Sequence, residues 1–192
     1  MLWRSDFIKR KKGCPMPNNK VFNTVSMPIY SLQTNTYTSP AVEEDASAAA
    51  AAAGISFWLP TGNVTVGGSA NLLLQITNPS GSGKTVSINQ ISGGSSASAS
   101  LILYSGGTIT GGTTPTPSNS RLGTATTSIV TTKQLTGTLT GSPTTLYSTF
   151  VTAGLYNLVF QGGLVVPVNQ TLTVSLGVGS LTGSINLNWW EV

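Results

Sequence analysis

Apolar and polar residues alternate along most of the chain after residue 54, and this two-residue period is typical of strands that bury one face. Gly, Pro, Asn and Ser separate the alternating segments, and no segment among them carries the spacing of a helix. The segments lie at 55–59, 70–76, 86–88, 101–104, 124–132, 134–140, 155–160, 172–178 and 185–189. The pattern predicts an all-β fold, a β-sandwich or jelly roll of about eight to ten short antiparallel strands.

The segment from Ser69 to Ser92 allows two interpretations. Its GSGKT run at 81–85 is similar to the end of a phosphate-binding P-loop, whose glycine-rich turn opens a helix. However, Asn78 occupies the position of the first P-loop glycine, and the residues after Lys84 alternate as in a strand. We therefore predict a β-hairpin with its turn at 78–83. On this interpretation Lys84 is one of the few charges of the β-body and stands at a strand start beside an exposed loop. Lys84→Ala should therefore leave stability and assembly nearly unchanged.

The first 54 residues differ from this pattern. Residues 1–40 are basic and then polar, and four prolines interrupt them, so they form an N-terminal arm without a core of its own. Residues 41–54 are rich in alanine, with Ser39 and Pro40 suited to a helix start and Gly54 to its end. This segment is either a short docked helix or a linker, and it joins the arm to a β-body of residues 55–192.

The composition of the β-body excludes several kinds of catalytic and metal site. Only 7% of the 192 residues are charged, histidine is absent and Cys14 is the only cysteine. Disulfides within the chain, zinc sites of Cys and His, and nucleophiles activated by histidine are therefore excluded. Glu191 is the only acidic residue after residue 54, which also excludes a pair of catalytic carboxylates there. We expect no catalytic residue, no metal and no cofactor, and hence a protein that is not an enzyme.

The net charge of +4 belongs to the arm, and its basic residues are Arg4, Lys9, Arg10, Lys11, Lys12 and Lys20. Such a run can dock on a protein surface, neutralise nucleic-acid phosphates or remain solvated. Nucleic acid is the less favoured partner, because the arm lacks the interleaved aromatic residues of single-strand binders. No apolar run reaches the length of a membrane span or follows the basic cluster as in a signal peptide, so we expect neither a membrane nor export.

Trp189 and Trp190 end the last alternating segment. Strand geometry sends one ring into the core and the other to the opposite face. The outward ring is a candidate for a subunit interface, because interfaces favour tryptophan.

Three motifs carry a resemblance to known proteins. They are NPSGSGKTVSINQIS at 78–92, GGLVVPVNQTLTVSLGVGS at 162–180 and SINLNWWEV at 184–192. They resemble the β-sandwich virion proteins of tailed bacteriophages, the group of head decoration (cement) proteins and head fibres. The resemblance implies a non-enzymatic structural subunit, often a homotrimer, made in the host cytoplasm and placed on the capsid surface or an appendage. Its implied partners are the major capsid protein or other virion subunits.

An alternative function belongs to a different class. The chain could be a receptor- or glycan-binding module of a fibre or tail, with the turn-rich loop at 106–120 and Trp190 as its contact surface.

Overall fold

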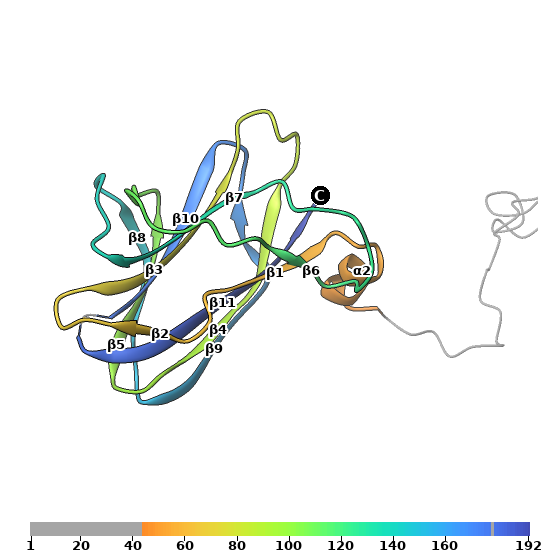
Figure 1. The fold of residues 1–192 in the computed structure, drawn as a ribbon. Helices are drawn as coiled ribbons and strands as arrows, with labels where there is room; N and C mark the ends of the chain where they lie inside the picture. Colours follow the sequence, from red (N-terminus) through yellow and green to blue (C-terminus); the bar gives the residue numbers. More distant parts are fainter. Residues whose placement is uncertain (1–43, 178) are drawn as a thin grey trace, which may run out of the picture. The chain divides into compact units, whose positions relative to one another are not determined.

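The computed structural model describes residues 44–177 and 179–192, so the predicted arm of residues 1–40 lies outside the described residues. The described part begins with one short helix, α2 (Ala46–Ala52), followed by strands (Figure 1). The strands are β1 (Ser56–Pro60), β2 (Val64–Val66), β3 (Asn71–Asn78), β4 (Val86–Ser95), β5 (Ala99–Ser105), β6 (Ser118–Asn119), β7 (Thr131–Gly137), β8 (Thr144–Val151), β9 (Gly154–Val166), β10 (Gln170–Gly177) and β11 (Leu181–Glu191).

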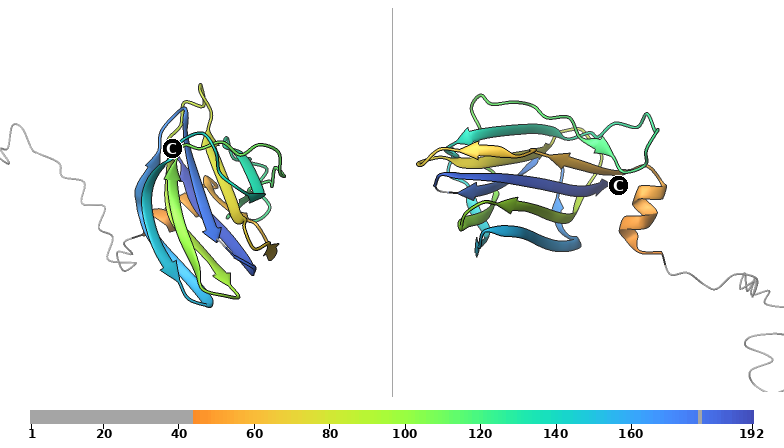
Figure 2. Two further views of the ribbon diagram at one scale, coloured as in Figure 1. Left: turned by 90° about the vertical axis from the view of Figure 1, so that its left-hand side faces the viewer. Right: turned by 60° about the horizontal axis from the view of Figure 1, so that its bottom comes forward.

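The strands form two antiparallel sheets that pack face to face (Figure 2). The first sheet has the order β6-β1-β11-β4-β9, with β2 also paired to β11. The second has the order β7-β3-β10-β5-β8. The prediction of an all-β sandwich is therefore confirmed.

Four antiparallel strand pairs are nested within one another. The outermost pair is β1 with β11, and β3 with β10, β4 with β9 and β5 with β8 follow inward along the chain. Successive pairs alternate between the two sheets. A long antiparallel ribbon wrapped around a common core produces this order, which is that of a jelly roll. The last strand consequently lies in the middle of its sheet, between β1 and β4.

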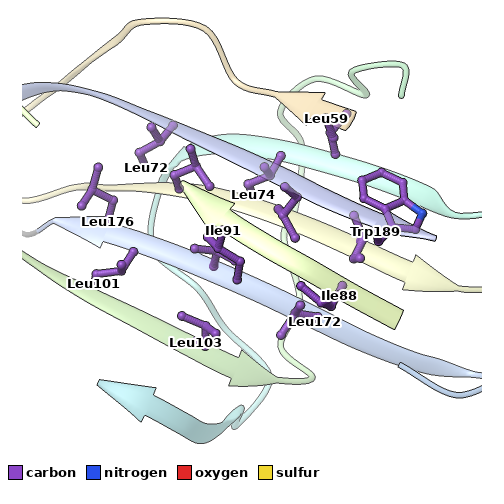
Figure 3. Packing of buried hydrophobic residues seen from close by; sticks show 14 of the residues in the cluster. Leu59, Leu72, Leu74, Ile88, Ile91, Leu101, Leu103, Leu172, Leu176 and Trp189 are labelled. Atoms are coloured by element: carbon purple, nitrogen blue, oxygen red, sulfur yellow. The ribbon is translucent and has the colours of Figure 1, made fainter. Parts of the chain in front are cut away.

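The core lies between the sheets and is built from the alternating residues that the sequence indicated (Figure 3). Leu72, Leu74 and Ile76 of β3 face it from one sheet, and Ile88 and Ile91 of β4 face it from the other. All five side chains are fully buried. The hydrophobic effect therefore acts across the two sheets, on the faces selected by the two-residue period.

The segment between β3 and β4 is not a hairpin, which corrects our prediction. A strand does follow Lys84, but β3 and β4 belong to different sheets, so the turn at 79–85 carries the chain across the sandwich. Asn78 organises the crossing: it is fully buried, and its Nδ2 donates to the carbonyl oxygens of Lys84 at 2.8 Å and Val166 at 3.0 Å. Ser82 Oγ donates to Asn78 Oδ1 at 2.7 Å. The residue that replaces a P-loop glycine is thus a structural amide.

The loop after β5 is less exposed than its composition predicted. It crosses the outer face of the second sheet, where the carbonyl oxygens of Gly106 and Gly107 accept hydrogen bonds from Thr173 Oγ1 and Gln75 Nε2. Ile109 is buried, whereas residues 110–114 remain exposed. The loop therefore covers polar side chains of β3 and β10 that would otherwise face solvent.

Two further predictions about strands need correction. The separate segments at 124–132 and 134–140 contribute a single strand, β7, which begins at Thr131 and ends at Gly137. Strand β8 was not predicted, because most of its residues are exposed and its sequence TTLYSTFV lacks regular alternation.

The alanine-rich segment forms a docked helix. Helix α2 begins at Ala46, after the non-helical Glu44 and Asp45, and Gly54 with its positive φ of 73° follows its end, as predicted. Ala50 is buried, and Arg121 Nη1 donates to the carbonyl oxygen of Ala52 at 3.1 Å. The compact body accordingly extends from Glu44 to Val192 and includes the helix.

The role of Asn78 can be tested by substitution. Asn78→Ala should lower the free energy of unfolding by about 3 kcal/mol, because buried carbonyl groups lose their donor. The measurement is urea unfolding followed by tryptophan fluorescence. Ser80→Ala is the matched control, since Ser80 is exposed in the same turn, and it should change stability by no more than about 0.5 kcal/mol. Equal effects of the two substitutions would contradict the assignment.

Candidate binding surfaces of the sandwich

The structure separates the two tryptophans, as strand alternation predicts. Trp189 is completely buried in the core, where its ring lies 6.1 Å from that of Phe57, centroid to centroid. Trp190 is half-buried on the outer face of the first sheet, against a bulge of β9. A Cβ on Gly162 in this bulge would lie only 2.5 Å from the Trp190 ring. Only Trp190 of the pair therefore has surface to offer to a partner.

The basic residues of the arm, from Arg4 to Lys20, lie outside the described residues. Docking by the arm consequently stays a prediction.

A buried carboxylate closes one end of the core. Glu191 Oε1 accepts hydrogen bonds from Ser128 Oγ at 2.5 Å and from the indole Nε1 of Trp189 at 3.1 Å. The backbone N–H of Ile129 lies 3.2 Å from both carboxylate oxygens. Lys84 Nζ lies 3.9 Å from Oε2, and this is the one ion pair within residues 44–177 and 179–192. The lysine of the GSGKT run thus has a protein carboxylate as its partner, which the sequence did not reveal.

Among the described residues, strands β8 and β9 form an edge of the sandwich that no further strand covers. Each strand is the last in its sheet, and residues 144–166 contain no charged side chain. Leu155, Phe150 and Val159 are 95%, 85% and 57% exposed, respectively. Leu146 of β8 lines a small hollow together with Leu164 and Val165 of β9, so the two strands approach each other at this edge. We refer to residues 144–166 as the β8–β9 edge.

The opposite edge is protected. There, β6 has only two residues, Lys133 of β7 is exposed, and Thr113 of the covering loop forms backbone hydrogen bonds with Gln134. Short strands, charges and covering loops are the usual means of keeping a sheet edge from pairing with another chain. The two edges therefore differ in their capacity to bind a neighbour.

A shallow groove of about 510 Å³ lies on the first sheet. None of its lining residues is charged, and four of them carry side-chain amides, namely Asn63, Gln90, Asn157 and Asn186. The remaining lining residues are Ser92, Gly93, Gly94, Leu155, Tyr156, Thr182, Gly183 and Ser184. We refer to this hollow as the polar groove.

Tyr156 of β9 lines the groove, and its side chain extends across the neighbouring strand β4 toward β11. Its hydroxyl donates to the carbonyl oxygen of Ser184 on β11 at 2.8 Å, and a Cβ on the intervening Gly93 would lie 2.6 Å from that hydroxyl oxygen. Glycine is thus required at position 93. Burial raises the pKa of the Tyr156 phenol above its ordinary value, because the phenolate would lose solvation.

Comparison with protein-family models, with curated proteins and with solved structures finds no match for the chain. Within the described part, no three His, Cys, Asp or Glu side chains gather as metal ligands do, and no helix is long and apolar enough to cross a membrane. The sequence showed neither the edge nor the groove. Two features of the sequence are related to these surfaces. No charged residue occurs between Lys133 and Glu191, and the pair Gly93-Gly94 lies within strand β4.

The buried carboxylate gives a prediction about two neighbouring substitutions. Glu191→Ala should lower the free energy of unfolding by about 3 kcal/mol, because three protein donors lose their acceptor. Lys84→Ala should cost no more than about 1 kcal/mol, because its ammonium is partly solvated and 3.9 Å away. Chemical denaturation of both variants measures the difference. A larger loss for Lys84→Ala would show that the ion pair, rather than the hydrogen bonds, holds this end together.

Because the pKa of the buried Tyr156 phenol is raised, we expect the folded protein to lose stability at alkaline pH. Above about pH 10 the unfolded chain releases the phenolic proton while the folded chain retains it, so unfolding becomes easier as pH rises. Tyr156→Phe should be less stable at neutral pH, because it lacks the hydrogen bond to Ser184, but it should lose less stability between about pH 9 and about pH 11. Urea titrations of both proteins across this range test the claim. Parallel losses would exclude Tyr156 as the cause.

Proposed function

We propose that this protein is a non-enzymatic structural subunit that self-associates through the β8–β9 edge and docks on a larger assembly through its basic arm. The proposed assembly is the virion of a tailed bacteriophage, with the chain as a decoration, cement or head-fibre subunit. Its partners are then further copies of the chain, with a trimer favoured, and the major capsid protein.

The character of the β8–β9 edge carries this proposal. Six of its large apolar side chains are more than two-fifths exposed, namely Leu146, Tyr147, Phe150, Leu155, Val159 and Val165. Together they present on the order of 700 Å², if about 200 Å² is the full surface of one large side chain. A stable interface buries about 800 Å² on each partner, so a contact of this size would have to involve exposed side chains of both strands.

The unpaired backbone of the edge favours the same conclusion. Strand β9 has 13 residues without a charge or a proline, and within the described part it pairs with β4 on one side only. The N–H and C=O groups of its other side can therefore pair with another strand. A second copy of the chain suits this surface, because an uncharged edge is complementary to itself.

The virion assignment rests on different support. The motifs at 78–92, 162–180 and 184–192 resemble phage virion proteins, and a jelly roll is an architecture that viral capsid proteins use. Lectins and cupins use it as well, so the architecture supports the assignment by analogy only. The near absence of charge and of histidine from residues 54–192 fits a structural role better than catalysis.

Co-expression with the major capsid protein of the same phage tests both contacts. Phe150→Lys should convert the purified oligomer to monomers by light scattering, since a charge would be buried at the contact. Leu122→Lys is the matched control, because Leu122 is 93% exposed and lies outside the edge. Replacing Lys9, Arg10, Lys11 and Lys12 together by Ser should leave the oligomer intact but reduce the amount bound to capsids.

The oligomeric state tests self-association through the edge, and the amount bound to capsids tests docking through the arm. If the full chain remains monomeric at concentrations on the order of 100 µM, the edge is not a self-association surface. If the arm variant binds capsids as well as the unchanged chain does, docking through the basic run is wrong.

A further inference from the structure

We infer that the polar groove binds a short uncharged oligosaccharide. This inference does not depend on the structural role proposed above, because it concerns a hollow on the first sheet that is lined by residues of β4, β9 and β11 and by Asn63. The groove of about 510 Å³ is within the range of about 300–1,000 Å³ that is usual for small-ligand sites.

The floor of the groove lacks a side chain at Gly94 of β4. Gly183 of β11 also lines the groove, but a Cβ there would point into the core, 2.8 Å from a methyl group of Leu176, so Gly183 is required by the core and does not set the depth of the groove. Gly94 differs. Its φ is not in the positive range, and a Cβ there would make only ordinary contacts, 3.5 Å or more from its neighbours. The fold therefore tolerates alanine at position 94, and the glycine matters chiefly for the depth of the groove.

The walls of the groove offer unengaged hydrogen-bonding groups. Within the described residues, the side-chain amides of Asn63, Gln90, Asn157 and Asn186 take part in no hydrogen bond with protein. The neighbouring Asn188 is in contrast fully engaged in the structure, since its Nδ2 donates to the carbonyl oxygen of Phe57 and its Oδ1 accepts from Asn89. Each free amide can donate and accept, as can each sugar hydroxyl.

The charge of the groove selects the class of ligand. None of its lining residues is acidic or basic. A phosphate or a sialic acid would find no cation to neutralise it, and a metal ion would find no carboxylate. Leu155 on the rim is 95% exposed and adds an apolar surface for the C–H groups of a sugar ring. A neutral polyhydroxylated ligand fits this combination better than a charged one.

The experiment uses the full-length chain. It is first applied to an array of neutral and sialylated oligosaccharides, and the strongest neutral binder is then titrated by NMR. We expect binding to neutral glycans only. Asn186→Ala, which removes a donor and an acceptor, and Gly94→Ala, which fills the floor, should each weaken binding roughly tenfold, equivalent to about 1.4 kcal/mol.

Matched controls separate the groove from the fold and from the edge. Gly67→Ala is the same substitution at an exposed position outside the groove, where a Cβ meets nothing within 4 Å, and it should bind like the unchanged chain. Phe150→Lys should also retain binding, so failure of self-association and failure of the groove give different results. Leu155 is left unchanged because it belongs to both surfaces.

Three results would overturn the inference. The first is no binding to any neutral glycan at millimolar concentration, and the second is a preference for sialylated glycans. The third is unchanged affinity in both Asn186→Ala and Gly94→Ala when circular dichroism shows that they are folded.

Discussion

The central position of β11 is the constraint on which the sandwich depends. This last strand pairs with both β1 and β4. Phe57 therefore pairs with Trp189, although more than half of the chain separates these two residues in the sequence. Loop-closure entropy opposes such distant pairings, and the buried side chains of both sheets must offset it together. At the end of the strand, the Glu191 carboxylate accepts hydrogen bonds from residues 128–129 and so connects the closing strand to the segment before β7.

Amide side chains take the place of charges inside this body. Asn78 holds the crossing between the sheets, Asn188 bonds to the backbone of β1, and Gln75 bonds to the loop that covers the second sheet. An amide donates and accepts at once, and burying it costs far less than burying an ion. This explains how a chain with 7% charged residues satisfies its interior polar groups: within the described part, every buried side-chain nitrogen and oxygen has a partner.

The surface of the body divides into regions of different chemistry. The edge at β6 and β7 is short and covered by a loop. The β8–β9 edge is long and apolar, and no element of residues 44–177 and 179–192 pairs with its outer side. The polar groove lies on the face next to that edge. Apolar contact favours a protein partner, whereas free amides favour a hydroxyl-rich ligand. A jelly roll fixes none of these properties, because the same architecture serves unrelated functions. They come from the residues placed on its edges and outer faces.

The sequence by itself determined which residues face the core, from Leu72 to Trp189, because a two-residue period assigns every side chain of a strand to one face. It also indicated the end of the helix at Gly54 and showed that the chain has no histidine. It did not determine the partner of each strand: the turn at 79–85 crosses between sheets, and periodicity is the same for a hairpin and for a crossing. Strand β8 was not predicted because most of its residues on both faces are exposed, whereas the other edge strand, β9, alternates in burial. The pairing of Lys84 with Glu191 and the assembly of the groove were decided only by tertiary structure, since they join residues that nested strand pairing brings together from opposite ends of the body.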